Sequence, residues 1–164
     1  MVHVRESGVN YLHLSVCWVT GRYLKMWHFA NSFTSFFMSN EPIHIGKQMK
    51  SETFRKRPFV QFGESTLIPE AEAAASNTSS YLSSMAEVGW GLALLLAEIA
   101  PEHQNEILTR GFEIGHSRII AGYNYATDVQ ASRIMAACVV AHLHADADFQ
   151  KLIDKAKKEY GKNK

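Results

Sequence analysis

The most apolar segment of the chain, "SSMAEVGWGLALLLAEIA" (residues 83–100), has hydrophobic residues on most sides of a helical projection. A helix that is apolar all round is typical of the centre of a fold, so this segment predicts a buried central helix. Ser84 and Glu87 fit the S-x-x-E capping box, which places the start of the helix at Ser84. Gly89 and Gly91 each destabilise a helix by about 1 kcal/mol relative to alanine, so we expect another helix to pack closely there.

Three more helices are predicted after this one. The first spans residues 102–120, is broken near Gly122, and has four residues expected to face inward: Ile107, Leu108, Phe112 and Ile114. The second begins at Thr127 or Asp128 and continues through "VQASRIMAACVVAHLH". The third spans residues 146–160 and ends at Gly161, because apolar residues recur at i, i+3, i+4 and i+7: Phe149, Leu152, Ile153 and Ala156.

The first half of the chain has a weaker pattern. A helix is predicted from about residue 43 to residue 56, ending at Arg57-Pro58 because the residue before a proline is disfavoured in a helix. Residues 59–80 are predicted as a connection with one helical turn near "PEAEAAA". Strand signals are weak throughout, so we predict an all-α protein with a poorly defined N-terminal segment (residues 1–40) and one helical domain (residues 41–164).

Composition narrows the classes of function. With 164 residues, 46% of them hydrophobic and 20% charged, the chain fits one globular domain that needs no disulfide or metal. A formal net charge of +1 argues against binding nucleic acid or an anionic membrane through bulk charge. The two cysteines are too few for a disulfide framework, and Cys138 is expected to be buried among apolar residues.

Neither membrane insertion nor export is indicated by the sequence. No apolar run approaches the roughly 18 residues that a membrane-spanning helix needs. The beginning of the chain is a poor signal peptide, because Glu6 lies in its front part and no small-x-small cleavage site follows its apolar patch.

Three segments carry groups that could bind an anion, beginning with "KSETFRKRP" (residues 50–58). On one helix, Lys50 and Arg57 would differ by about 20° in direction and about 10.5 Å along the axis, so both could reach one anion. The alternative is a solvated basic face that also includes Lys47, Arg55 and Lys56.

The second segment is the start of the central helix, where free backbone N–H groups and the hydroxyls of Ser83 and Ser84 form a possible anion site. The alternative is ordinary N-capping by serine. The third segment is "SRIIAGYNYATD" (residues 117–128), in which the planar guanidinium of Arg118 could bind two phosphate oxygens. Arg118 could instead form an ion pair with Asp128. Asn124 and Asp128 are four residues apart, which suits a hydrogen bond if they share a helical turn.

The order of these segments is Lys-x6-Arg-Pro, a serine-rich helix start, then Ser-Arg-x5-Asn-x3-Asp. It resembles the three-part signature of the bacterial class A non-specific acid phosphatases, which belong to the type-2 phosphatidic acid phosphatase and vanadium haloperoxidase superfamily. The likeness is collinear over roughly residues 44–160. It implies a compact helical bundle of the acid phosphatase and haloperoxidase type, shortened here at its N-terminus, and a periplasmic or secreted location.

The resemblance also implies roles for individual residues. The phosphate-binding residues would be Lys50, Arg57, Ser83, Ser84 and Arg118. The carboxylate that orients the catalytic histidine would be Asp128. The family's histidine nucleophile is replaced by Asn124, and the second histidine, the general acid, is replaced by Met85. Ser84 stands where the family has glycine.

Both replacements remove the chemistry that the family uses. An amide nitrogen shares its lone pair with the carbonyl group, and a thioether has no proton to donate. Loss of the general acid alone lowers a rate by about 10² to 10⁴. We therefore expect binding of phosphate or a small phosphomonoester with weak or absent hydrolysis. The alternative is a non-catalytic helical pseudophosphatase or an interaction protein whose charges pair with each other.

No other residue is expected to replace the missing groups. His116 would point about 200° away from Arg118 on a continuous helix, so it is expected at the surface. His142 and His144 lie on opposing faces, and the sequence has no H-E-x-x-H or Cys/His cluster, so neither a metal nor another cofactor is expected. The number of subunits is left open, a homo-oligomer included.

Overall fold

The computed structural model describes residues 48–49 and 51–162, and this part of the chain is helical without a strand. Its α-helices are α4 (Pro58–Phe62), α5 (Glu72–Ala75), α6 (Ser84–Ile99), α7 (Gln104–Ile120), α8 (Ala126–Leu143) and α9 (Ala147–Gly161). Two short 3₁₀ turns, Pro69–Ala71 and Pro101–His103, precede α5 and α7. The prediction of an all-α protein is confirmed. The predicted segment of residues 1–40 lies outside the described residues.

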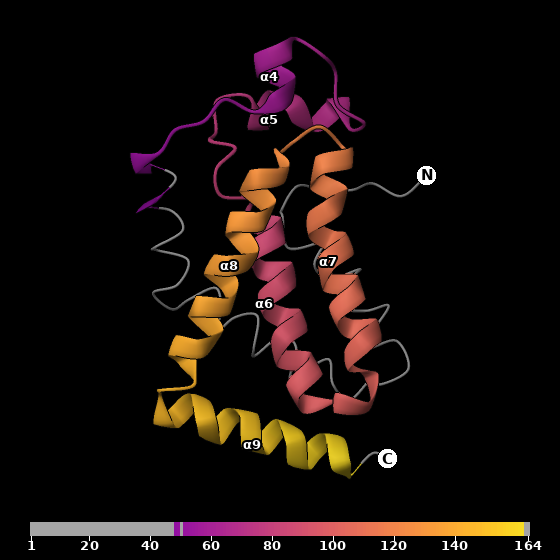
Figure 1. Ribbon diagram of the computed structural model, residues 1–164, viewed down its shortest axis with the longest axis vertical. Coiled ribbons are helices and arrows are strands. Elements are labelled where there is room, and N and C mark those ends of the chain that lie inside the picture. The colour runs from indigo at the N-terminus through magenta and orange to yellow at the C-terminus, as the bar shows by residue number, and fades with distance from the viewer. Residues whose placement is uncertain (1–47, 50, 163–164) are drawn as a thin grey trace.

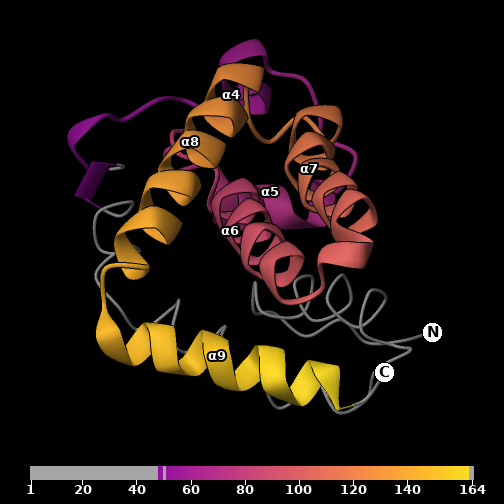
Figure 2. The ribbon, with the colours of Figure 1, turned by 60° about the horizontal axis from the view of Figure 1, so that its bottom comes forward.

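Three long helices, α6, α7 and α8, lie side by side, and α9 crosses their far ends (Figure 1). Figure 2, a view turned by 60°, shows the same arrangement with α6 between its two neighbours. Because the chain reverses direction between successive helices, α6 and α8 begin at the end where α7 finishes. The short helices α4 and α5 lie at this same end, so residues from the first, middle and later parts of the described chain meet there.

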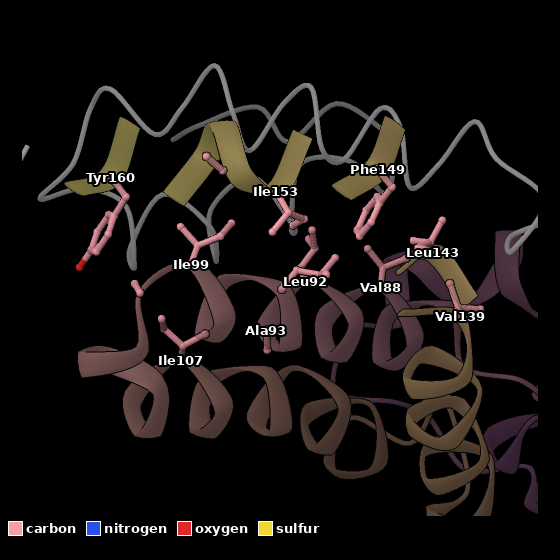
Figure 3. Packing of buried hydrophobic residues seen from close by; sticks show 13 residues of the cluster. Val88, Leu92, Ala93, Ile99, Ile107, Val139, Leu143, Phe149, Ile153 and Tyr160 are labelled. Carbon is pink, nitrogen blue, oxygen red and sulfur yellow. The ribbon is translucent and has the colours of Figure 1, made fainter. Parts of the chain in front are cut away.

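The main hydrophobic core lies between α9 and the helices that it crosses, and Figure 3 shows its side chains. Phe149 and Ile153 of α9 are fully buried and point toward Val88 and Leu92 of α6. Each large apolar side chain buried in this way contributes about 1.5–3 kcal/mol to stability. The apolar stripe predicted for the last helix is therefore confirmed. The carboxylate of Asp146 caps this helix by accepting hydrogen bonds from two backbone N–H groups.

The expected close approach at a glycine of the central helix is confirmed for Gly89. A methyl group at this position would lie 2.7 Å from Cγ2 of Ile114 on α7, which is closer than two carbon atoms can pack. The contact explains why the helix contains a residue that destabilises it locally.

The predicted helix from about residue 43 to residue 56 is wrong at its end, from Thr53 onward, while its residues 43–47 and 50 lie outside the described residues. Residues 48, 49, 51 and 52 are helical, but the backbone from Thr53 to Arg57 is not. Arg57 is extended (φ −66°, ψ 152°), and Pro58 begins a new helix as its first residue. A proline favours both outcomes, because it restricts the preceding residue and suits the first helical position. Arg57 therefore does not share a helix face with Lys50, which lies outside the described residues.

Three smaller expectations are corrected. The N-cap of α6 is Ser83 rather than Ser84, although the helix begins at Ser84 as predicted. Phe112 is 46% exposed rather than inward-facing, and its ring packs against the Arg133 guanidinium of α8, which lies 4.3 Å from the ring centre. Cys138 is exposed, because the buried face of α8 passes through Ala136 and Val139 on either side of it.

Among the described residues, no helix is both long enough and apolar enough to cross a membrane.

Candidate phosphate-binding site

The segments singled out by the sequence meet where α6 and α8 begin and α7 ends. The non-helical segment before α4 (residues 53–57) passes this end, and so do the residues that lead into α6. Backbone bonds fix the arrangement: Ser80 N donates to Arg55 O (2.8 Å), and the carbonyl oxygen of Arg118 accepts from the N–H groups of Tyr123 and Asn124 (3.0 and 3.2 Å). Because α6 and α8 both begin here, the positive ends of their helix dipoles lie in this region.

Asp128 is the most completely buried charged group of this region, with 0% exposure. Its Oδ1 accepts a hydrogen bond from Nη1 of Arg55 (2.7 Å), while Oδ2 accepts from Ser80 Oγ (2.5 Å) and from the backbone N of Tyr125 (3.0 Å). The bond to Tyr125 N caps the start of α8. The ion-pair partner of Asp128 is thus Arg55, and not Arg118 as one of the alternatives had it.

Asn124 lies beside this carboxylate but is joined to it through Ser80. Nδ2 of Asn124 donates to the carbonyl oxygen of Ser80 (2.6 Å). The side-chain hydroxyl of Ser80 in turn donates to Asp128. The direct Asn124–Asp128 hydrogen bond is not formed, because α8 begins at Ala126 and Asn124 precedes its first turn. Asn124 is 4% exposed and fixed in place.

Arg57 is half-buried and held by uncharged oxygen atoms. Its Nε donates to Ala75 O and Thr78 Oγ1 (both 3.1 Å), Nη1 donates to Tyr123 O (3.0 Å), and Nη2 donates to Thr78 Oγ1 (2.9 Å). Burial lowers the pKa of Arg57, and the positive charge of Arg118 lowers it further, whereas the negative charge of Asp128 raises it. The two guanidinium groups are therefore close enough to repel each other.

Arg118 lies in the last turn of α7, with its guanidinium 4.4 Å from the centre of the Tyr123 ring. A cation over an aromatic face is attracted by the quadrupole of the ring. Arg57 and Arg118, which are 61 residues apart in the sequence, thus both contact Tyr123.

At the start of α6, the two serines differ. Ser83 is 3% exposed, its hydroxyl accepts from Ala86 N (3.4 Å), and its backbone N donates to Ser132 Oγ (2.8 Å). It has the N-capping role that was the alternative to anion binding. Ser84 is exposed, and Met85 is half-buried in the first turn of the helix. Among the residues carried over for phosphate binding, only Lys50 lies outside the described part of the chain.

Comparison with known proteins bears on what this arrangement is. The sequence model of a protein family described as the PAP2 superfamily matches residues 25–151, most of the chain. The chain belongs to the PAP2 superfamily. Its relatives include a "Non-specific acid phosphatase" of Providencia stuartii, 43% identical over 72% of this chain. An "Acid phosphatase" of Zymomonas mobilis is 41% identical over 69% of it. A "Non-specific acid phosphatase" of Salmonella typhimurium is 40% identical over 67% of it.

These matches confirm the predicted kinship with the class A acid phosphatases. The PAP2 chain spans less than half the length of these relatives, between 43% and 48%. Positions 85 and 124, which the resemblance aligns with the two histidines of the family, carry a thioether (Met85) and an amide (Asn124).

The histidines within the part of the chain that the structure describes lie away from this site. His116 is exposed and stacks on Phe112 (ring centres 5.9 Å apart), so the prediction of a surface histidine is confirmed. His144 contacts Glu98 at the opposite end of α6. Within residues 48–49 and 51–162, no group of three His, Cys, Asp or Glu side chains is placed to hold a metal ion.

Sequence reasoning missed two residues of the site, Arg55 and Ser80. Arg55 had been assigned to a solvated basic face, yet it pairs with Asp128 and lies over the Tyr125 ring at 3.8 Å. Ser80 is 0% exposed and connects Asn124 to Asp128. No spacing rule links residues 55, 80 and 128, since their contacts depend on how distant segments cross.

Proposed function

We propose that this chain binds inorganic phosphate, or the phosphoryl group of a small phosphomonoester, with hydrolysis weak or absent. The ligand lies between Arg57, Arg118 and the start of α6, with Lys50 as a third cation. The observation that carries the proposal is that two guanidinium groups contact the same residue. Nη1 of Arg57 donates to the carbonyl oxygen of Tyr123, and the guanidinium of Arg118 lies over the Tyr123 ring. The positive charge of Arg118 lowers the pKa of Arg57, and a bound oxyanion would offset this repulsion.

The hydrogen bonds of Arg57 support the same proposal. A guanidinium has five N–H groups, and the bonds to Ala75, Thr78 and Tyr123 engage one on each nitrogen. One N–H on Nη1 and one on Nη2 therefore remain for a ligand. Because its partners fix the plane of the group beforehand, little side-chain entropy is lost when an oxyanion binds.

Weak or absent hydrolysis follows from the groups beside the proposed pocket. The amide nitrogen of Asn124 is committed to Ser80 O and has no basic lone pair to attack phosphorus. Met85 has no proton for the leaving oxygen. Phosphoryl transfer depends on positioning and on charge neutralisation, so the cations retain a binding role when the reactive groups are absent.

The test is a thermal melt of the purified chain with and without phosphate, and with vanadate as a second oxyanion. A ligand at 100 times its Kd stabilises the folded state by about 2.7 kcal/mol. Arg118→Met is expected to abolish most of this gain. Arg110→Met, on the same helix and paired with Glu113, is the matched control and is expected to retain it. A phosphate effect that is equal in both variants would contradict the proposed site.

Hydrolysis is measured separately with a chromogenic phosphomonoester at acidic pH, and a rate near background is expected. Robust turnover that disappears in Asp128→Asn would show that the chain retains catalysis through another nucleophile.

A second candidate function is a non-catalytic interaction protein. The Arg55–Asp128 ion pair favours it, because this pair neutralises part of the region without a ligand. Phosphate and vanadate would then leave the melting temperature unchanged in the parent chain as well as in both arginine variants.

A further inference from the structure

A carboxylate on α6 connects the end of α8 to α9, at the opposite end of the molecule from the candidate phosphate site. Glu98 Oε2 lies 2.8 Å from Nε2 of His144, the C-cap residue of α8. Glu98 Oε1 accepts a hydrogen bond from Nζ of Lys157 on α9 (2.7 Å). Three helices therefore meet on the two oxygens of one side chain.

Both ring nitrogens of His144 face oxygen atoms that can only accept. Nδ1 lies 2.7 Å from the carbonyl oxygen of Val140, and Nε2 faces the Glu98 carboxylate. A neutral imidazole has one N–H, so one of these contacts would set two lone pairs against each other. An imidazolium donates to both oxygens at once. The geometry therefore matches the protonated ring.

We propose that His144 is an acid-state clamp: its protonated ring binds Glu98 and helps to hold the α8–α9 corner on α6, and deprotonation weakens this attachment. The ring also packs edge-on against Phe149, the first large core residue of α9 (ring centres 5.3 Å apart). Loss of the contact to Glu98 would thus weaken the packing of His144 against Phe149, where α9 joins the core. This inference does not depend on phosphate binding.

The charged groups around the ring set the direction of the pH dependence. On the ring's own helix, the hydrogen bond to Val140 raises the pKa of His144; from α6 the Glu98 carboxylate raises it too, whereas burial and Lys157 of α9 lower it, and the net shift is upward. Asp146 also lies in this corner, with its Oδ1 engaged by two backbone N–H groups of α9. A folded-state pKa above the unfolded value means that the clamp contributes fully below the unfolded pKa. Its contribution is lost as the pH rises through the folded pKa.

The experiment combines nitrogen-detected NMR of the histidine rings with melting curves of the full chain. At about pH 5.5 the ring of His144 is expected to carry two N–H groups, and to titrate at a higher pH than in Glu98→Gln. His144→Gln is expected to melt about 2–4 °C below the parent at this pH and within about 1 °C of it near pH 9. His142→Gln, exposed on the same helix, is expected to match the parent at both.

Three results would overturn the clamp. The first is a ring with a single N–H at about pH 5.5. The second is a titration midpoint that Glu98→Gln leaves unchanged. The third is a melting difference for His144→Gln that is the same at both pH values, since a purely steric role would not change with protonation.

Discussion

Asp128→Ala is expected to destabilise the fold severely, although the resemblance assigns this residue a role in catalysis. The carboxylate is fully buried and accepts hydrogen bonds from Arg55, Ser80 and the backbone N of Tyr125. Its removal leaves a buried hydroxyl and a helix-capping N–H group without their acceptor. The side chain thus fixes the start of α8 to two distant segments.

The magnitude follows from the partners that remain. A buried donor left without an acceptor costs about 1–3 kcal/mol, and Asp128→Ala leaves two such donors, the Ser80 hydroxyl and the Tyr125 N–H. The Arg55 side chain is 40% exposed, so water solvates it after the ion pair is lost, and the pair itself contributes at most about 1 kcal/mol. Because the hydroxyl of Ser80 can rotate toward another acceptor, we expect a net loss of about 2–4 kcal/mol in the free energy of unfolding.

The assay is urea unfolding of the parent chain and of Asp128→Ala at neutral pH, with Asp148→Ala as the matched control. Asp148 also lies in the first turn of a helix, but its side chain is 86% exposed and pairs only with Lys151. Its loss is expected to cost less than about 1 kcal/mol. If Asp128→Ala lies within about 1 kcal/mol of this control, the buried carboxylate is not the structural connection described above.

Two further predictions concern the start of α6 and the missing histidines. Ser83→Ala is expected to lower the free energy of unfolding by about 1 kcal/mol, and Ser84→Ala by much less, because Ser83 is the N-cap; equal losses would contradict this assignment. Met85→His combined with Asn124→His is expected to raise hydrolysis of a chromogenic phosphomonoester well above either single variant, because nucleophile and acid act as one unit. Three of the roughly four acceptor sites of Asp128 are occupied, which leaves one to orient the new histidine. A double variant no faster than the parent would argue against an otherwise intact pocket.

The long helices could be predicted because their signals are local. Apolar periodicity and a terminal glycine placed α9 correctly, and the close contact at Gly89 followed from a residue that a helix otherwise disfavours. The helix before Pro58 was extended too far, since proline begins α4 and leaves Arg57 in an extended conformation. The proline rule predicted that the helix could not continue past Arg57, but not that the non-helical segment would begin as early as Thr53.

The candidate site was only partly predictable for a different reason. Arg57 and Arg118 were singled out through the order of motifs along the chain, and both contact Tyr123 in the structure, whereas their role in binding phosphate stays a prediction. Arg55 and Ser80 have no spacing that marks them, because their contacts to Asp128 span 73 and 48 residues. The pairing of Asp128 with Arg55, in place of the expected alternative with Arg118, depends on the course of a non-helical segment.

One consequence concerns how variants at the two ends of α6 combine. Ser84 and Glu98 are separated by about 21 Å along the helix axis. The Debye length at physiological salt is about 8 Å, so the charge gained by protonation of His144 is largely screened from an anion near Arg57. Free-energy changes from substitutions in the two regions should then sum to within about 0.5 kcal/mol. The proposed affinity for phosphate and the proposed pH dependence at α9 should thus be adjustable separately, although both involve the same helix.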